Sequence, residues 1–333
     1  MLDWIGHTFN LCLKDGVFPA IWKCANLVLI PKAVKPNVPE GNLPKVRSIC
    51  LLDEIGKAFE RIIAERIAAW QMGNPVSDLS ANQFGFRRQR SSCDALLLVK
   101  EITSTAVRDG GFAIVISLDI RNAFNSIPWP NIHKSLRRMG FPDYLRRIID
   151  SYLSERVIRF IGYDGGTQKR PTEAGVPQGS VLGPVLWNIS YNNVLRVADD
   201  DENCHILCYA DDTLIVATGN NITRTRVRAC TVASRVISKI ESLGLSVATE
   251  KTEATLFYGK RAGNLLDYIT INQVCIDLAP SIKYLGVYID NGWTFTDHFR
   301  YIEEKASRVI KTLNRLMPNL GGLMRIVVGY FPT

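Results

Sequence analysis

The stretch His205–Val216, HILCYADDTLIV, contains two runs of strand-forming residues separated by a small residue and two adjacent acids. The runs His205–Tyr209 and Thr213–Val216, joined by so short a turn, predict a β-hairpin. Adjacent aspartates flanked by apolar residues are costly without a cationic partner, because burial penalises a charged carboxylate. Asp211 and Asp212 therefore indicate a cation site, although Asp-Asp is also ordinary turn chemistry and this hairpin alone leaves both interpretations open.

A second stretch favours the cation site. Phe112–Leu118, FAIVISL, is a continuous apolar run with the length of a buried strand, and it ends directly in Asp119. An acid at the end of a buried strand can stand beside the acids of a neighbouring hairpin turn. Three such carboxylates form a hard, oxygen-rich site of the kind that Mg²⁺ prefers. Two metal ions in such a site can stabilise the attacking and leaving oxygens of a phosphoryl transfer.

Composition indicates a globular intracellular protein with an anionic partner. The chain has 333 residues, of which 47% are hydrophobic and 22% charged, which supports one large domain or a few subdomains. No apolar run has membrane-spanning length, and the N-terminus lacks the pattern of a secretory signal. The formal net charge of +8 favours nucleic acid, with basic flanks around an acidic middle, residues 101–220, that holds the candidate site. Solvated surface charge alone would explain the same number.

The eight cysteines show no disulfide-framework spacing and are interpreted as reduced thiols. Cys204, His205 and Cys208 could suggest half of a zinc site. No second half-site follows them, and they alternate along the expected strand. Structural zinc needs about four ligands, so an ordinary structural role is favoured for these three residues.

Hydrophobic periodicity predicts an alternation of helices and short strands. Helix-capping residues at Ser91 and Asp94 precede an expected helix over 95–107. The segments 269–276 and 282–289 are predicted to be two strands that pair with each other, followed by a helix over 295–316. Asn82–Arg90, NQFGFRRQR, combines aromatic and guanidinium groups that suit nucleic acid, but buried phenylalanines with solvated arginines are equally consistent.

Three motifs, taken in order, resemble a known family: Asp119 to Phe124, Gly175 to Pro184 (GVPQGSVLGP), and Tyr209-Ala210-Asp211-Asp212. Over nearly the whole chain, the sequence resembles the reverse transcriptases of LINE-like, non-LTR retrotransposons, in particular arthropod elements. The resemblance implies an α+β right-hand polymerase fold with fingers, a palm built on an antiparallel sheet flanked by helices, and a partial thumb. The implied divisions are fingers at 1–110, palm at 111–160, the Gly-Pro-Gln loop and its helix at 161–200, palm at 201–292 and a truncated thumb at 293–333.

The resemblance also assigns residues to roles. The metal-binding acids fall on Asp119, Asp211 and Asp212, with the carbonyl of Ile120 as a further ligand, and two Mg²⁺ ions are expected, with Mn²⁺ as a substitute. Lys251 matches the lysine that protonates the pyrophosphate, and Phe124 matches the aromatic residue that excludes a 2′-hydroxyl, although Phe124 can also be plain core. The remaining expected positions hold the dNTP (Lys32, Arg47 and Gln178) and the primer and template (Phe86, Arg87, Gly179, Tyr209, Leu285 and Gly286).

Two positions depart from the family pattern: Ser48 stands where Pro is common after the arginine, and Ala248 stands where Asn is usual. The upstream endonuclease domain, most of the thumb and a downstream Cys/His segment are also missing, so the chain is expected to be a fragment of the Pol polyprotein. The predicted function is RNA-directed DNA polymerase, with an RNA template, a DNA primer and dNTPs, no membrane, and a nuclear location expected from the family.

Two alternatives remain beside this prediction. One is a catalytically inactive retroelement relic that at most binds nucleic acid. The other is an RNA-dependent RNA polymerase with the same palm, against which Phe124 argues. Primer extension with an Asp211→Asn control tests for a working reverse transcriptase, and replacement of Phe124 by Val or Ala, which should raise ribonucleotide use, tests the second alternative.

Overall fold

The computed structural model describes residues 2–31, 46–259 and 267–316. A four-stranded antiparallel sheet lies at its centre, in the order β6 (Cys204–Tyr209), β7 (Asp212–Gly219), β3 (Phe112–Leu118) and β8 (Glu253–Tyr258). The apolar run of β3 is central because helices cover both faces of the sheet, which removes the usual alternation of polar residues. The sequence prediction for this strand and for the β6–β7 hairpin is confirmed.

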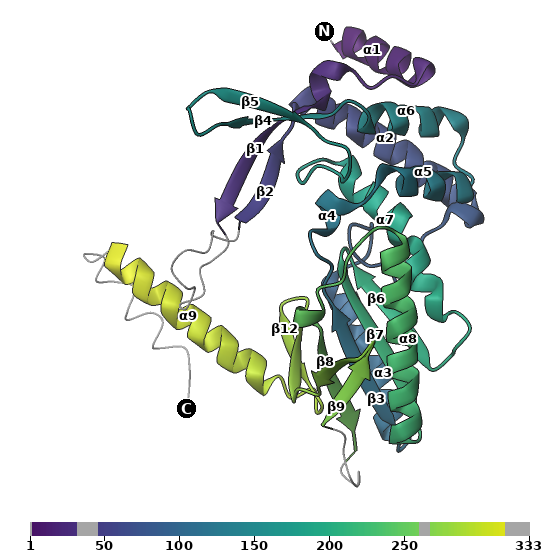
Figure 1. The fold of residues 1–333 in the computed structure, drawn as a ribbon, viewed down its shortest axis with the longest axis vertical. Coiled ribbons are helices and arrows are strands. Elements are labelled where there is room, and N and C mark those ends of the chain that lie inside the picture. The colour runs from purple at the N-terminus through teal and green to yellow at the C-terminus, as the bar shows by residue number, and fades with distance from the viewer. Residues whose placement is uncertain (1, 32–45, 260–266, 317–333) are drawn as a thin grey trace.

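Alternate side chains of β3 belong to separate parts of the core. Ile114 and Ile116 pack in one cluster with α8 (Ile222–Ser242), whereas Ala113 and Val115 pack in another with α3 (Ser92–Arg108). The start of α3 is fixed by the expected capping residues, because the Ser91 hydroxyl accepts from the Asp94 N–H and the Asp94 carboxylate accepts from the Ser91 N–H. Figure 1 shows α8 as the outer flank of this sheet.

A second four-stranded sheet has the order β2 (Val46–Leu51), β1 (Cys24–Pro31), β4 (Val157–Ile161) and β5 (Thr167–Pro171). It projects from a helical layer that includes α1 (Leu2–Asp15), α2 (Glu54–Gly73), α5 (Trp129–Arg138) and α6 (Asp143–Leu153) (Figure 1). Aromatic rings connect α2 and α6 through the segment that follows α1, since Phe18 contacts both Phe59 and Tyr152.

The expected division at residue 110 remains a prediction. Strands β1 and β2, on its N-terminal side, share a sheet with β4 and β5, while α3, on the same side, contacts β3, β7 and β8 of the central sheet. The N-terminal part of the chain therefore contributes to both sheets.

The prediction for 269–276 and 282–289 is wrong. Each segment is a hairpin by itself: β9 (Tyr268–Ile271) pairs with β10 (Val274–Asp277), and β11 (Ser281–Tyr284) pairs with β12 (Val287–Asp290). The turns lie at Asn272-Gln273, with φ of 47° and 68°, and at Leu285-Gly286, with φ of 48° and 85°. Two consecutive positive φ values suit the tight two-residue turns that join antiparallel strands. Gln and Leu rarely adopt them, so the sequence hid both turns.

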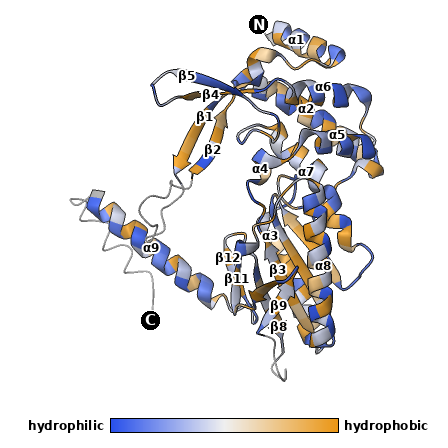
Figure 2. Cartoon of the chain, in the orientation of Figure 1, coloured by the Kyte–Doolittle hydropathy of each residue, from blue (hydrophilic) through white to orange (hydrophobic). Residues whose placement is uncertain are grey.

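The remaining helices are α4 (Ala123–Ser126), α7 (Leu182–Leu195) and α9 (Thr296–Leu316). Polar and apolar residues alternate along α9 in Figure 2, whereas α7 is buried along most of its length. All eight cysteines are free thiols. In the described ranges, no helix combines the length and the apolar character needed to cross a bilayer.

Candidate active site

The turn between β6 and β7 carries two of the three candidate acids. Tyr209 pairs with Asp212 at the last ladder position, so Ala210 and Asp211 form the turn, with Ala210 at φ 61°. A left-handed backbone conformation is strained for any residue other than glycine, so surrounding contacts must stabilise Ala210 in it. The turn is thereby presented at one end of the central sheet.

The segment Asn82–Gly85 fixes this turn from one side. Phe84 donates its N–H to the Cys208 carbonyl at 2.8 Å, and Cys208 donates back to the Asn82 carbonyl at 2.9 Å. A Cβ on Gly85 would lie 2.2 Å from the backbone nitrogen of Ala210, so only glycine fits against the turn.

Of the two interpretations of Asn82–Arg90, burial applies to one phenylalanine and exposure at the site to the other. Phe84 is buried, but Phe86 is 56% exposed at the site, with its ring centroid 6.1 Å from that of Phe124. Arg87 donates to the Ser80 carbonyl at 2.6 Å and pairs with Asp78 at 3.2 Å, so its guanidinium ties its own loop together. Its expected contact with nucleic acid remains a prediction.

Trp187 on α7 holds the turn from beneath, a role that the sequence did not reveal. Its indole N–H donates to the Ala210 carbonyl at 2.8 Å, and its ring stacks on Tyr191 with centroids 5.1 Å apart. Tyr191 in turn shares a hydrogen bond with the Thr213 hydroxyl, at 2.8 Å, just after the acids. One buried helix face therefore anchors both sides of the Asp211-Asp212 pair.

Asp119 comes to the same place because of the strand register. Leu118, at the end of β3, pairs with Thr213, so Asp119 follows directly beside Asp212. The pKa of Asp212 is raised to about 6. The larger cause is partial burial of its carboxyl group, and the negative charges of Asp211 and Asp119 add to it. The three acids therefore meet as the sequence predicted, and their mutual repulsion favours a cation.

Lys251 places a positive charge beside these acids. Its ammonium forms an ion pair and hydrogen bond with the Asp119 carboxylate. The backbone brings them together, because the Asp119 carbonyl accepts from Ala248 at 2.8 Å and Arg121 donates to the Ser246 carbonyl at 2.8 Å. An Arg121–Glu250 ion pair of 2.7 Å closes the same junction. The loop before Lys251 is thus fixed by backbone contacts although Ala248 replaces the usual Asn.

The donor chemistry of the three acids fits a hard divalent cation, since carboxylate oxygens are the ligands that such a cation prefers and the charges of Asp211 and Asp119 help to raise the pKa of Asp212. In the described part of the chain, no three or more His, Cys, Asp or Glu side chains are arranged as a formed metal cluster. The Asp119 carboxylate is engaged by the Lys251 ammonium. A metal ion would therefore have to compete with Lys251 for Asp119.

Phe124 lies on the short helix α4, beside the acids. Its ring centroid is 5.1 Å from that of Trp187, and its carbonyl accepts from the Val176 N–H at 2.7 Å. The ring therefore packs on the helix that anchors the Asp211 turn, and the Phe124 backbone is bonded to the Gly-Pro loop. Ile120, one residue after Asp119, is buried and forms an isolated bridge with Val247.

The Gly-Pro-Gln loop joins the site to the second sheet. The Gln178 carbonyl accepts from the Cys50 N–H of β2 at 2.8 Å. Gly179 has φ 116°, and a Cβ there would lie 2.6 Å from the Cys50 carbonyl oxygen. The buried Glu60 carboxylate accepts from the N–H groups of Val181 and Leu182 at 2.6 and 3.0 Å, where α7 begins. Glu60 was missed, although a charged residue among the apolar positions of α2 was a signal.

The other expected residues are less closely connected to the acids. Arg47 is exposed on β2 opposite Ile30, and Leu285 and Gly286 form the β11–β12 turn. Lys32 lies outside the described residues. Their predicted contacts with nucleotide and primer remain predictions.

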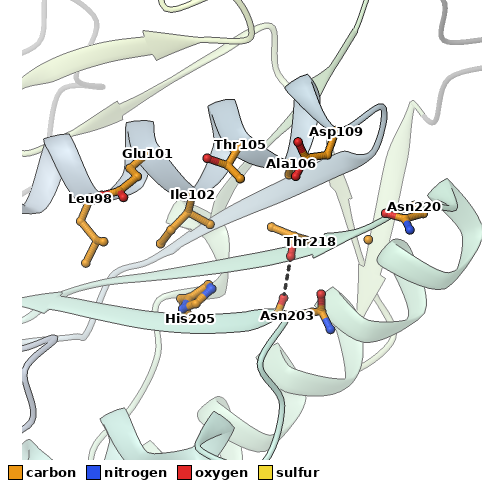
Figure 3. Close-up of a pocket in the computed structure, with 11 residues that line it drawn as sticks. Leu98, Glu101, Ile102, Thr105, Ala106, Asp109, Asn203, His205, Thr218 and Asn220 are labelled. Carbon is orange, nitrogen blue, oxygen red and sulfur yellow. Dashed lines mark hydrogen bonds between the residues drawn. The ribbon is translucent and has the colours of Figure 1, made fainter.

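One pocket lies at the far end of the hairpin from the acids. This pocket of about 420 Å³ is lined by α3 and by Thr218 and Gly219, at the opposite end of β7 from Asp212 (Figure 3). His205 points into it, whereas Cys204 and Cys208 belong to the core cluster on the other face of β6. The three residues cannot share a metal ion, which agrees with the structural role favoured for them.

An antiparallel sheet flanked by helices, with one acid after its β3 strand and two at the end of an adjoining hairpin, defines the palm of a right-hand polymerase. The fold is similar to that of solved telomerases. Apo telomerase from Candida tropicalis matches with a TM-score of 0.55 and 12% identity, covering 86% of this chain and 58% of that one. Telomerase from Candida albicans matches with a TM-score of 0.56 and 13% identity, covering 86% and 50%.

The chain belongs to the reverse transcriptase (RNA-dependent DNA polymerase) family, whose pattern matches residues 30–289. It is 29% identical over 310 residues to the RNA-directed DNA polymerase from mobile element jockey of Drosophila melanogaster, covering 91% of this chain and 33% of that protein. It is 27% identical to the Pol polyprotein of retrotransposable element R1 of Bradysia coprophila, covering 95% and 30%. The resemblance to non-LTR retrotransposon enzymes is confirmed, and the chain spans about a third of the length of these relatives.

Proposed function

We propose that this chain carries the polymerase site of a retrotransposon reverse transcriptase, which copies the element's RNA into DNA. The observation that carries the proposal is the convergence of Asp119, Asp211 and Asp212, expressed in the raised pKa of Asp212. Polymerisation requires neutralisation of phosphate charge at the reacting centre. An acidic cluster of this kind can bind the cations that neutralise it.

The proposed cofactor is a pair of Mg²⁺ ions, for which Mn²⁺ would substitute, and divalent metals are general in this family. Asp119, Asp211, Asp212 and the Ile120 carbonyl would hold them, and the metals would lower the charge on the reacting phosphates. Lys251 neutralises Asp119 in the metal-free chain. Once released from that carboxylate, its ammonium is the group suited to donate a proton to the leaving pyrophosphate.

Phe124 supports a preference for deoxynucleotides. Its ring is packed on Trp187 and against Phe86, so it cannot readily move aside for a 2′-hydroxyl. Arg47 and Gln178 are proposed to hold the incoming dNTP, and the tight turn at Leu285 and Gly286 to support the primer end. We also propose that the enzyme works in the nucleus, where nicked chromosomal DNA would supply the primer.

The test is primer extension on poly(rA)·oligo(dT) with dTTP and Mg²⁺. Asp211→Asn should abolish extension because it removes a carboxylate from the metal site, and Asp199→Asn, an exposed acid on the loop before β6, serves as the matched control. Extension by Asp211→Asn at the wild-type rate would refute the metal assignment. Failure of the unaltered chain to extend would favour the inactive relic.

A further inference from the structure

A basic groove lies on the outer side of the palm, between the end of α7, the short helix η3 (Arg196–Ala198) and the outer face of α8. Its volume is about 870 Å³. Three cations line it, Arg196, Arg235 and Lys239, together with four Ser or Thr hydroxyls and one Asn. Among the described residues that line it there is no carboxylate and no aromatic ring.

The groove continues along α8. A second depression of about 430 Å³ shares Thr231 and Arg235 with the first and extends to Arg224 and Arg228, and one carboxylate, that of Asp201, also lines it. From Arg224 to Lys239 the helix rises about 22 Å. Because one edge of the path is a helix face with cations at several turns, it can follow an extended polyanion over several phosphates.

The cations along this path differ in how strongly they are already paired with acids. Arg235 pairs with Asp200 at 3.2 Å, but both side chains are exposed, and such surface pairs contribute little. Arg228 pairs more closely with Asp201, at 2.9 Å. Partial burial, and then the charge of neighbouring Arg196, lower the pKa of Arg138. Two guanidinium groups of like charge side by side are stabilised when a phosphate lies between them.

The groove is separate from the proposed catalytic cleft. In Figure 1, α8 forms one flank of the central sheet, whereas α9 and the β11–β12 hairpin lie on the opposite side. The buried face of α8 packs on β3 and β7, so its outer face points away from the sheet. A strand bound here would not be the primer–template duplex at the acids.

We propose that this α7–α8 groove binds the sugar-phosphate backbone of a nucleic-acid strand outside the primer–template duplex. Cations and hydroxyls contact phosphates without reading sequence, and the absence of aromatic rings among the described lining residues leaves no platform for base stacking. The binding is therefore electrostatic, insensitive to sequence and strongly dependent on salt. It does not require polymerase activity.

The test compares binding of labelled 20-nucleotide RNA and DNA strands over a range of salt, by fluorescence anisotropy. The groove variant is Arg196→Gln with Lys239→Gln. The matched control, Arg66→Gln with Lys100→Gln, removes the same charge from exposed positions on α2 and α3. Loss of two phosphate contacts should weaken binding about tenfold near 0.1 M salt and reduce the slope of log K against log salt by about 1.4.

The control variant should bind like the unaltered chain, and the groove variant should still extend a short primer–template at the normal rate. Loss with RNA alone would identify RNA as the occupant, and loss with both strands would identify a backbone site without sugar preference. Equal binding by the groove variant and the unaltered chain, or an equal loss in the control variant, would overturn the proposal. Because Asp211→Asn should leave this binding intact, failure of the polymerase assay and failure of the groove are distinguishable.

Discussion

Replacement of Trp187 by Phe tests whether the buried face of α7 holds the Asp211 turn. The indole is fully buried, donates to the Ala210 carbonyl at 2.8 Å and stacks on Tyr191. Phenylalanine keeps an aromatic ring but lacks the N–H donor. The change therefore removes one hydrogen bond and a small volume while retaining most of the apolar contact.

The expected loss of stability follows from these two terms. A buried carbonyl left without its donor costs about 1–3 kcal/mol. The smaller ring leaves a void that adds about 1 kcal/mol. The free energy of unfolding should therefore fall by about 2–4 kcal/mol, and primer extension should fall further than stability alone explains, because the Asp211 turn loses its anchor.

Equilibrium urea unfolding measures the first effect, and extension at saturating dTTP, under conditions where the variant is folded, measures the second. Trp4→Phe is the control, because Trp4 is 72% exposed on α1 and the same change of ring there should cost under 0.5 kcal/mol. If Trp187→Phe and Trp4→Phe were equally stable and equally active, the proposed anchor would be refuted.

Three further predictions concern the same site. Asp212→Asn should stabilise the metal-free chain at pH 7, because the folded-state pKa of Asp212, about 6, lies above the usual 3.8 and wild-type stability is therefore lost as pH rises through 6. The loss is about 3 kcal/mol before solvent screening and about 1 kcal/mol after it. Thermal unfolding of the variant and the wild type, measured at pH 4.5 and 7.5, should converge at the lower pH. Gly179→Ala should cost about 1–3 kcal/mol in urea unfolding, because its Cβ would meet the Cys50 carbonyl oxygen at a positive φ, whereas Gly73→Ala, with open space around it, should cost nothing. Phe124→Val should raise incorporation of UTP relative to dTTP, and an unchanged ratio would exclude Phe124 as the sugar gate.

Local signals made much of the candidate active site predictable. The apolar run that forms β3 ends at the residue where the strand ends, and the Ala210-Asp211 turn lies between two strand-forming runs. These features depend on neighbours in sequence, which a pattern records. The Ser91–Asp94 capping box is predictable for the same reason.

The residues that support the site were not predictable in this way, because their partners lie far along the chain. Trp187 meets Ala210 across 23 positions, and Glu60 meets Leu182 across 122. Without coordinates, Trp187 is one more apolar residue of a buried helix, and Gly85 one more glycine of a loop. The turns at Gln273 and Leu285 were hidden for a different reason, since their positive φ values contradict the usual preference of those side chains.

The Lys251–Asp119 contact spans 132 positions of the chain, and the segment Asn82–Gly85 contacts the Asp211 turn from more than a hundred positions upstream. Contacts of such sequence separation close large loops, which slows folding and places their formation late. During synthesis, Asp119 cannot pair with Lys251 until most of the palm has emerged from the ribosome. Hydrogen exchange during refolding should accordingly show protection of the α3 and α8 amides before protection of Ala248, whose N–H reaches the Asp119 carbonyl only when the whole palm is assembled.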